Sequence, residues 1–230
     1  MAFNNKTVFF LIALIIILSI IFIYLINNRP TTFHILIATA GRPSLRKLLN
    51  SLRNELEAGD AITIVFDGAK AKTKSGIGPE WFEGHKSHIS IIEQIPNLGF
   101  WGHGIRNKYQ GILEPNCTFV MHADDDDVYI AGSFAKLRKL CTNPNYLYLA
   151  RLEKFLTKEN NRREIIPSLG QTVIIGGDVS TQNGIIPSKI AEKGDWGNFY
   201  GGDGHYYKAV KDHASGVIFL DDVIYTIVVS

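Results

Sequence analysis

The first apolar segment of the chain covers residues 8–26 and contains no charged side chain. Its length is close to the about 20 residues that a helix needs to cross the hydrocarbon core of a bilayer. A cleaved signal peptide is the alternative, but its apolar stretch is normally shorter and precedes small residues at a cleavage site. The pattern therefore predicts a retained transmembrane helix, with an anchor and a short stalk over residues 1–30. The flanking lysine and arginine residues leave open which membrane face carries the rest of the chain.

The pattern after residue 30 predicts alternating strands and helices. Apolar runs of strand length occupy residues 33–38 and 61–66, and leucines at helical spacing occupy residues 45–56 between them. A strand, a helix and a strand in this order are typical of a right-handed parallel unit. The pattern then predicts a glycine-rich loop, a strand, a helix and a strand, at residues 70–84, 89–95, 104–113 and 118–121.

The second half of the chain is less regular. We expect a helix and then four strands, at residues 133–140, 146–152, 171–175, 217–220 and 223–229. A stretch rich in glycine and aromatic residues, 194–207, precedes the last two strands. Together the halves predict one α/β domain over residues 31–230, built on a mixed, mainly parallel central sheet that is flanked by helices.

Composition excludes several kinds of function. The formal net charge is only +2 at pH 7, and no basic stripe is interleaved with aromatic residues, so the sequence does not predict a nucleic-acid surface. The two cysteines, Cys117 and Cys141, make neither a disulfide framework nor a zinc site. The roughly 200 residues after the anchor suffice for one domain with its own core.

Four consecutive aspartates, Asp124 to Asp127, follow the predicted strand at residues 118–121. Two carboxylates about 5 Å apart repel each other by on the order of 1 kcal/mol in water, and by more in a shielded site. A divalent cation such as Mg²⁺ or Mn²⁺ offsets this repulsion, because both ions prefer oxygen ligands and share them with phosphates. A solvated acidic turn is the alternative.

Polar residues also follow the first two predicted strands. Residues 39–42 stand after the first strand, and Asp67 and Gly68 stand after the second. Ligands of open parallel sheets bind beyond the carboxyl ends of the strands. Three polar clusters at such ends predict one shared site, although an Asp-Gly pair is also a common turn.

Taken together, these residues resemble the glycosyltransferase family 2-like enzymes of the GT-A fold, the nucleotide-diphospho-sugar transferase fold. The resemblance extends over residues 33–225 and depends on the order of several short motifs. The motifs are residues 39–42, Asp67-Gly68, Asn97-Leu98-Gly99, Arg106-Asn107, the aspartates as an Asp-x-Asp-Asp motif, and Gly202-Asp203.

The resemblance implies a metal-dependent glycosyltransferase with Mn²⁺ or Mg²⁺ as its cofactor. Such an enzyme moves a sugar from a UDP- or GDP-sugar to a glycan or lipid-linked acceptor, and we expect inversion at the anomeric carbon. The metal stabilises the departing diphosphate as a Lewis acid. The implied nucleotide-sugar contacts are Thr39, Arg42, Asp67, Arg106, Asp124 and Asp125. For Arg42 and Arg106, an ordinary solvated arginine is the alternative.

Within the acidic run, we expect Asp126 to be the direct metal ligand. Asp124 is expected to contact the metal or the ribose, and Asp127 to orient the site. If the run is extended, alternation of side chains places Asp124 and Asp126 on one side and Asp125 and Asp127 on the other.

A transferase of this kind also needs a base for the acceptor hydroxyl. Asp203 is the candidate, since it lies between two glycines that allow close backbone approach and stands where the family keeps this carboxylate. A plain helix cap is the alternative. Acceptor contacts are expected from Trp196, Tyr200 and His205, with core packing as the alternative for the aromatic residues. His205 and His213 are in addition candidates for a third metal ligand, with a structural role as the alternative.

Two other functions fit parts of the sequence. A nucleotidyltransferase that makes sugar nucleotides normally has a glycine-rich loop and a following lysine after its first strand, whereas residues 39–43 contain one glycine and no such lysine. An anchored carbohydrate- or metal-binding module without catalysis would use the acidic run for binding alone.

Overall fold

The computed structural model describes residues 5–27, 30–112, 117–155 and 163–227. The chain divides into two compact units, Met1–Pro30 and Thr31–Ser230. The first unit contains the helix α1 (Asn5–Asn27). Among the described residues, no helix is long and apolar enough to cross a membrane. The N-terminal anchor and its orientation stay predictions.

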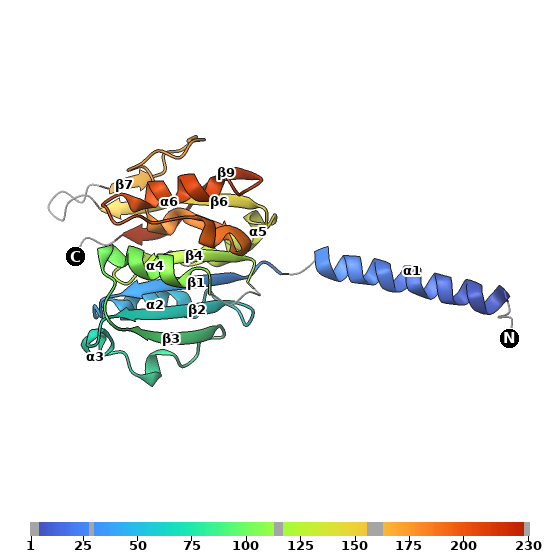
Figure 1. Cartoon of the computed structure of the whole chain (residues 1–230), viewed down its shortest axis with the longest axis horizontal. Helices are drawn as coiled ribbons and strands as arrows, with labels where there is room; N and C mark the ends of the chain where they lie inside the picture. Colours follow the sequence, from blue (N-terminus) through green and yellow to red (C-terminus); the bar gives the residue numbers. More distant parts are fainter. Residues whose placement is uncertain (1–4, 28–29, 113–116, 156–162, 228–230) are drawn as a thin grey trace. The chain divides into compact units, whose positions relative to one another are not determined.

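The first half of the second unit forms a parallel sheet with the predicted alternation of strands and helices (Figure 1). The strand order is β3-β2-β1-β4, and the strands are β1 (Phe33–Thr39), β2 (Ala61–Asp67), β3 (His88–Gln94) and β4 (Phe119–Asp124). The register pairs Thr39 with Phe66 and Ala38 with Asp124. The carboxyl ends of β1, β2 and β4 therefore lie at one edge of the sheet.

Helices cover both faces of this sheet. The buried leucines of α2 (Leu45–Arg53) share one core cluster with α5 (Ser133–Leu140) and with one face of β1, β2 and β4. The opposite face is covered by α4 (His103–Tyr109) and α6 (Gly202–Lys211), which lie in front of the sheet in Figure 1. The domain therefore has three layers, with the sheet in the middle.

Successive side chains of β1 point to opposite faces of the sheet and therefore pack against different layers of helices. Ile35 and Ile37 belong to the cluster that contains α2, whereas Leu36 and Ala38 belong to the cluster that contains α4. A strand that is covered on both faces needs apolar residues at successive positions, which is why β1 has a continuous apolar run.

The second half of the unit continues the sheet with mixed pairing. After β4 the order is β8 (Gly184–Pro187), β6 (Tyr146–Phe155), β9 (Gly216–Ile227) and β5 (Val128–Tyr129), and β7 (Arg163–Ile166) pairs with β6. β8 is antiparallel to both β4 and β6, whereas β6 and β9 are parallel. The prediction of a mixed sheet is therefore confirmed, whereas parallel pairing predominates in the first half only.

The structure also corrects three predicted elements. Residues 171–175 are irregular, and Val173 and Ile175 are exposed instead of packing in a sheet. The two strands predicted near the C-terminus are the single strand β9. The predicted loop at residues 70–84 contains α3 (Ala71–Ser75) and a 3₁₀ turn, η1 (Pro79–Trp81). Further 3₁₀ turns are η2 (Phe100–Gly102), η3 (Thr181–Asn183) and η4 (Ser188–Lys193).

Candidate active site

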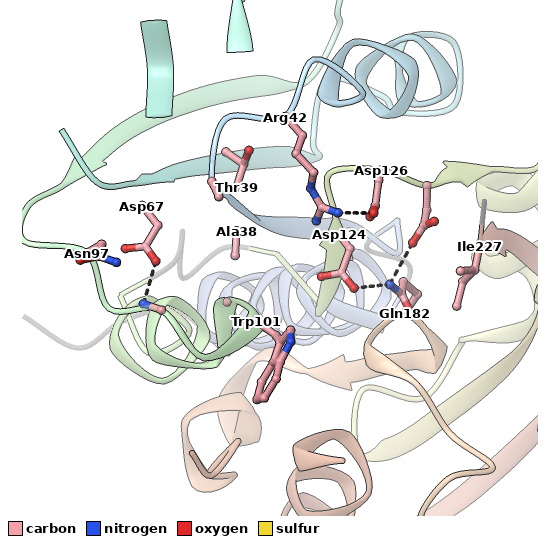
Figure 2. A pocket seen from close by; sticks show the side chains of 14 residues that line it. Ala38, Thr39, Arg42, Asp67, Asn97, Trp101, Asp124, Asp126, Gln182 and Ile227 are labelled. Carbon is pink, nitrogen blue, oxygen red and sulfur yellow. Dashed lines mark hydrogen bonds and ion pairs between the residues drawn. The ribbon is translucent and has the colours of Figure 1, made fainter. Parts of the chain in front are cut away.

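The aspartates at the end of β4 lie at a cavity of about 560 Å³, which we call the first cavity (Figure 2). Asp124, Asp126 and Asp127 line it. The remaining lining residues are Ala38, Thr39, Ala40, Arg42, Asp67, Asn97, Gly99, Trp101, Gly102, Gln182 and Ile227. Asp125 and Asp126 form a turn rather than an extended segment. The expected alternation therefore does not apply, and Asp127 shares the cavity with Asp124 and Asp126.

Arginine side chains offset the charge of the aspartates. Arg42 Nη2 lies 2.6 Å from Asp125 Oδ1, and its Nη1 pairs with Asp126 (Figure 2). Arg106 Nη2 pairs with Asp124. Protein cations therefore relieve part of the repulsion within the acidic run, and the divalent ion stays a prediction. Burial still raises the pKa of Asp126, against the opposing effect of Arg42.

Asp125 and Arg106, two of the predicted nucleotide-sugar contacts, lie outside the lining of the first cavity. Asp125 is fully buried and accepts a hydrogen bond from Thr39 Oγ1. Burial raises the pKa of Asp125, while the Thr39 hydrogen bond and Arg42 lower it. The Arg106 side chain is 1% exposed and lies over the Trp196 ring, 4.9 Å from its centroid. Both residues therefore contact cavity-lining residues without lining the cavity themselves. Asp125 bonds to Thr39 and Arg42, and Arg106 pairs with Asp124.

Gln182, in η3, connects two of the aspartates and was not predicted from the sequence. Its Nε2 donates to Asp124 Oδ2 at 2.7 Å and to Asp127 Oδ2 at 3.4 Å (Figure 2). A separation of 58 residues between Gln182 and Asp124 explains why no local pattern indicated this contact.

Asp67, at the end of β2, fixes the loop that follows β3. Its two carboxylate oxygens accept hydrogen bonds from the backbone N–H groups of Leu98 at 2.7 Å and Gly99 at 2.8 Å. This loop forms one wall of the first cavity through Asn97 and Gly99 (Figure 2). Asp67 therefore lines the cavity and also holds the loop in place.

A second cavity, of about 240 Å³, adjoins the first, because Trp101 and Asp124 line both. Its other lining residues are His103, Lys154, Ile166, Gly177, Val179, Ser180, Thr181, Tyr200, Gly201 and Asp203. Three predicted residues, Asp124, Asp203 and Tyr200, therefore meet at this cavity. Trp101, His103 and Thr181 were not predicted as site residues. The only local indication of a site here was the pair of glycines, Gly99 and Gly102, on either side of Phe100 and Trp101.

Asp203 lies in the first turn of α6, beside the second cavity. Its Oδ1 accepts a hydrogen bond from Thr181 Oγ1 at 2.6 Å. The N-cap residue of α6 is Gly201, and no side chain among the described residues caps this helix by a hydrogen bond, so Asp203 is not its N-cap. Burial raises the pKa of Asp203, whereas the Thr181 hydrogen bond lowers it. A carboxylate with a raised pKa at a cavity is suited to proton transfer.

The predicted acceptor residues have three different environments. Trp196 is fully buried and stacks on Tyr206, with ring centroids 4.3 Å apart. Its prediction as an acceptor contact is therefore wrong, and the core alternative is correct. Tyr200 is 85% exposed and lines the second cavity. His205 is exposed, contacts Phe199 edge-on, and lines neither cavity.

The first cavity offers few protein ligands for a metal. Within the described part of the chain, no group of three or more His, Cys, Asp or Glu side chains is arranged to hold an ion. Asp124 and Asp126 both line the cavity, however, and Mg²⁺ and related ions are often held by one or two carboxylates together with substrate phosphates and water. The residues therefore fit an ion that arrives with a diphosphate, rather than one bound by the protein alone.

No protein-family model and no curated protein matches this sequence. Among solved structures, TarS of S. aureus superposes with a TM-score of 0.66 at 16% identity, over 87% of this chain and 37% of TarS. The mannosyltransferase PcManGT from Pyrobaculum calidifontis, in complex with GDP-Man and Mn²⁺, superposes with a TM-score of 0.59 at 14% identity. That match covers 88% of this chain and 58% of PcManGT. The chain thus spans less than two thirds of either protein. The likeness confirms the predicted GT-A-like fold.

Proposed function

We propose that this chain is a metal-dependent glycosyltransferase that moves a sugar from a UDP- or GDP-sugar to a glycan or lipid-linked acceptor, with inversion at the anomeric carbon. The observation that supports it best is the pair of adjoining cavities, the first of which lies at the carboxyl ends of the parallel strands β1, β2 and β4. One contains the aspartates, the other contains Asp203, and they share Asp124. The GDP-Man and Mn²⁺ bound to the mannosyltransferase of similar fold support the donor class and the metal.

The first cavity is the proposed donor site. Asp67 receives the base, and Thr39 and Arg42 line the nucleotide pocket; all three residues line the cavity. The Arg42 guanidinium matches the paired oxygens of a phosphate and can exchange its carboxylate partners for them. Asp124 and Asp126 would hold Mn²⁺ or Mg²⁺ together with the diphosphate. Bound there, the ion supplies Lewis acidity to the departing diphosphate.

The second cavity is the proposed acceptor site, with Asp203 as the base. An acceptor hydroxyl oxygen forms the new bond to the anomeric carbon while the bond from that carbon to the diphosphate oxygen breaks. The hydroxyl proton moves to the Asp203 carboxylate, and the electron pair of the broken bond leaves with the diphosphate. Arg106 acts on this step indirectly, because it holds Asp124 at the junction of the two cavities.

The proposal is tested with the purified full-length chain and a panel of UDP- and GDP-sugars. We expect one nucleotide sugar to raise the melting temperature in the presence of Mn²⁺, because a ligand that binds the native state stabilises it, and to be hydrolysed slowly without acceptor. No nucleotide binding, with or without metal, would remove the proposal. Synthesis of a nucleotide sugar from a nucleoside triphosphate and a sugar phosphate would favour the nucleotidyltransferase alternative.

Thr181→Val is expected to move the acid limb of the transfer pH profile to higher pH. The Thr181 hydrogen bond lowers the pKa of Asp203, so its loss raises that pKa further above the ordinary value. Only the ionised carboxylate accepts the proton, and therefore a higher pH is needed for the same rate. The measurement is transfer rate against pH, with the exposed Thr73→Val as the matched control. An unmoved acid limb would mean that Asp203 does not control it.

Arg42→Met is expected to strengthen nucleotide-free Mn²⁺ binding and to weaken binding of the nucleotide sugar. Arg42 competes with a cation for Asp126, and a half-exposed ion pair of this kind contributes about 1 kcal/mol at most, or roughly five-fold in affinity. Calorimetric titration measures both affinities. Lys136→Met, which removes a surface cation paired with Asp222, is the control. Equal Mn²⁺ affinities in Arg42→Met and the unaltered chain would contradict the competition.

A further inference from the structure

His103, the first residue of α4, lines the second cavity although it is only 4% exposed. Its ring is held on several sides. Nδ1 lies 3.0 Å from the carbonyl oxygen of Gly197, and the Trp196 ring lies 5.7 Å away between centroids. Gly202 leaves room for the imidazole, since a Cβ at that position would lie 2.6 Å from Cε1. His103 therefore has a fixed place in the cavity wall.

The contact with Gly197 also fixes which nitrogen of His103 carries the proton. A carbonyl oxygen only accepts hydrogen bonds, so Nδ1 must donate. Burial and the nearby Arg106 lower the pKa of His103, which favours the neutral ring. Nε2 of the neutral ring is then a hydrogen-bond acceptor. Within the described residues, no hydrogen bond reaches Nε2, so a hydroxyl of a ligand can donate to it.

Trp101 forms an apolar surface at the junction of the two cavities. Trp101 is 67% exposed, and the Tyr200 ring stands edge-on to its ring with centroids 6.0 Å apart. Phe100 and Trp101 have φ angles of 55° and 53°, in the left-handed region that side chains other than glycine rarely adopt. Such a conformation is strained, and strained residues cluster at active sites and ligand-binding segments.

We propose that the second cavity is a saccharide subsite, in which one hydroxyl of a sugar ring donates to His103 Nε2 while an apolar face of the ring packs on Trp101. This inference rests on the proposed function and narrows its acceptor from a glycan or lipid-linked molecule to one with a sugar ring at the reacting end. A pyranose ring presents C–H groups on its faces and hydroxyls at its edge, and therefore fits an exposed indole beside a single acceptor nitrogen. A lipid phosphate without a sugar has no ring for Trp101 and no hydroxyl for His103.

The test uses the full-length chain and five methyl pyranosides as probes: glucoside, galactoside, mannoside, N-acetylglucosaminide and xyloside. At least one is expected to change the tryptophan fluorescence saturably, and Trp101→Phe is expected to remove that change. In transfer assays, His103→Phe is expected to raise the KM for that glycoside about ten-fold, the upper range for one neutral hydrogen bond, with a donor KM changed less than two-fold. His103→Gln keeps a hydrogen-bonding side chain and is expected to fall between His103→Phe and the unaltered chain. His88→Phe, at an exposed histidine of β3 outside both cavities, is the matched control.

The outcomes separate this inference from the proposed function. If the unaltered chain binds a nucleotide sugar and transfers to polyprenyl phosphate, but none of the five glycosides binds or reacts, the saccharide subsite is overturned and the transferase stands. Equal glycoside KM values in His103→Phe, His103→Gln and the unaltered chain also overturn it. If a glycoside binds at Trp101 while no nucleotide binds at all, the proposed transferase fails and the saccharide subsite stands.

Discussion

Replacing Asp203 with asparagine is expected to reduce sugar transfer by a factor of about 10² or more, the usual contribution of a general base. Asparagine has nearly the same shape as aspartate, and its Oδ1 can still accept the hydrogen bond from Thr181 Oγ1. It cannot take up the proton of the acceptor hydroxyl, so the loss belongs to the transfer step. Asp203 lies outside the lining of the first cavity, and donor affinity is therefore expected to stay within about two-fold.

The measurement is the initial rate of transfer at saturating donor and acceptor, together with donor affinity by calorimetry. Asp212→Asn is the matched control, because Asp212 is an exposed aspartate at the other end of the same helix. Near-normal transfer by Asp203→Asn would reduce Asp203 to a structural partner of Thr181. A loss of donor affinity equal to the loss of rate would mean that the substitution had disturbed the first cavity instead.

Three strands of the parallel half, β1, β2 and β4, were predictable because they are buried on both faces. Such strands have continuous apolar runs, and in β1 and β2 the runs end at polar residues, Thr39 and Asp67, that mark the carboxyl edge. β8 gave no comparable signal, since four residues that end in a proline do not form a recognisable pattern. The alternating pattern around Val173 and Ile175 is typical of a strand, but both residues lie exposed in an irregular segment. Local patterns do not distinguish these cases, because tertiary contacts decide them.

The site was predictable in position but only partly in its contacts. The sequence placed the aspartates at the edge of the sheet, yet it gave no indication that Arg42 pairs with Asp126 across 84 residues of sequence. Trp196 shows the same limit. An aromatic residue in a glycine-rich stretch is compatible with a ligand platform or with the core, and the stacked Tyr206 ring from α6 decides for the core. Long-range pairs of this kind are absent from any local pattern.

The ion pairs between arginines and aspartates at the first cavity affect how a metal ion would bind there. Arg42 and Arg106 already neutralise part of the acidic run in the absence of an ion. An arriving metal–diphosphate pair is expected to exchange partners with Arg42, whose side chain is 46% exposed and therefore able to move. Arg106, with a side chain that is 1% exposed, is expected to stay on Asp124. Metal and nucleotide sugar are thus expected to bind together.

Asp126→Asn is expected to remove the Mn²⁺-dependent part of nucleotide-sugar binding, a loss of about 100-fold or more. The estimate is a lower bound, because changes to residues that merely support metal ligands already cost about 10–100-fold in affinity. Asparagine keeps the size of the side chain but loses the charge that a hard divalent ion requires. Arg42 remains paired with Asp125, so the fold around the turn is expected to persist.

Calorimetric titration of the nucleotide sugar with and without Mn²⁺ measures this effect. Chelation of the metal should lower the nucleotide-sugar affinity of the unaltered chain to that of Asp126→Asn. Asp222→Asn removes a carboxylate that is paired with Lys136 on the surface, and serves as the control. If Mn²⁺ strengthens donor binding equally in Asp126→Asn and in the unaltered chain, Asp126 does not hold the metal. That result would leave Asp124 and Asp127, the other two aspartates that line the first cavity, as the candidate metal ligands.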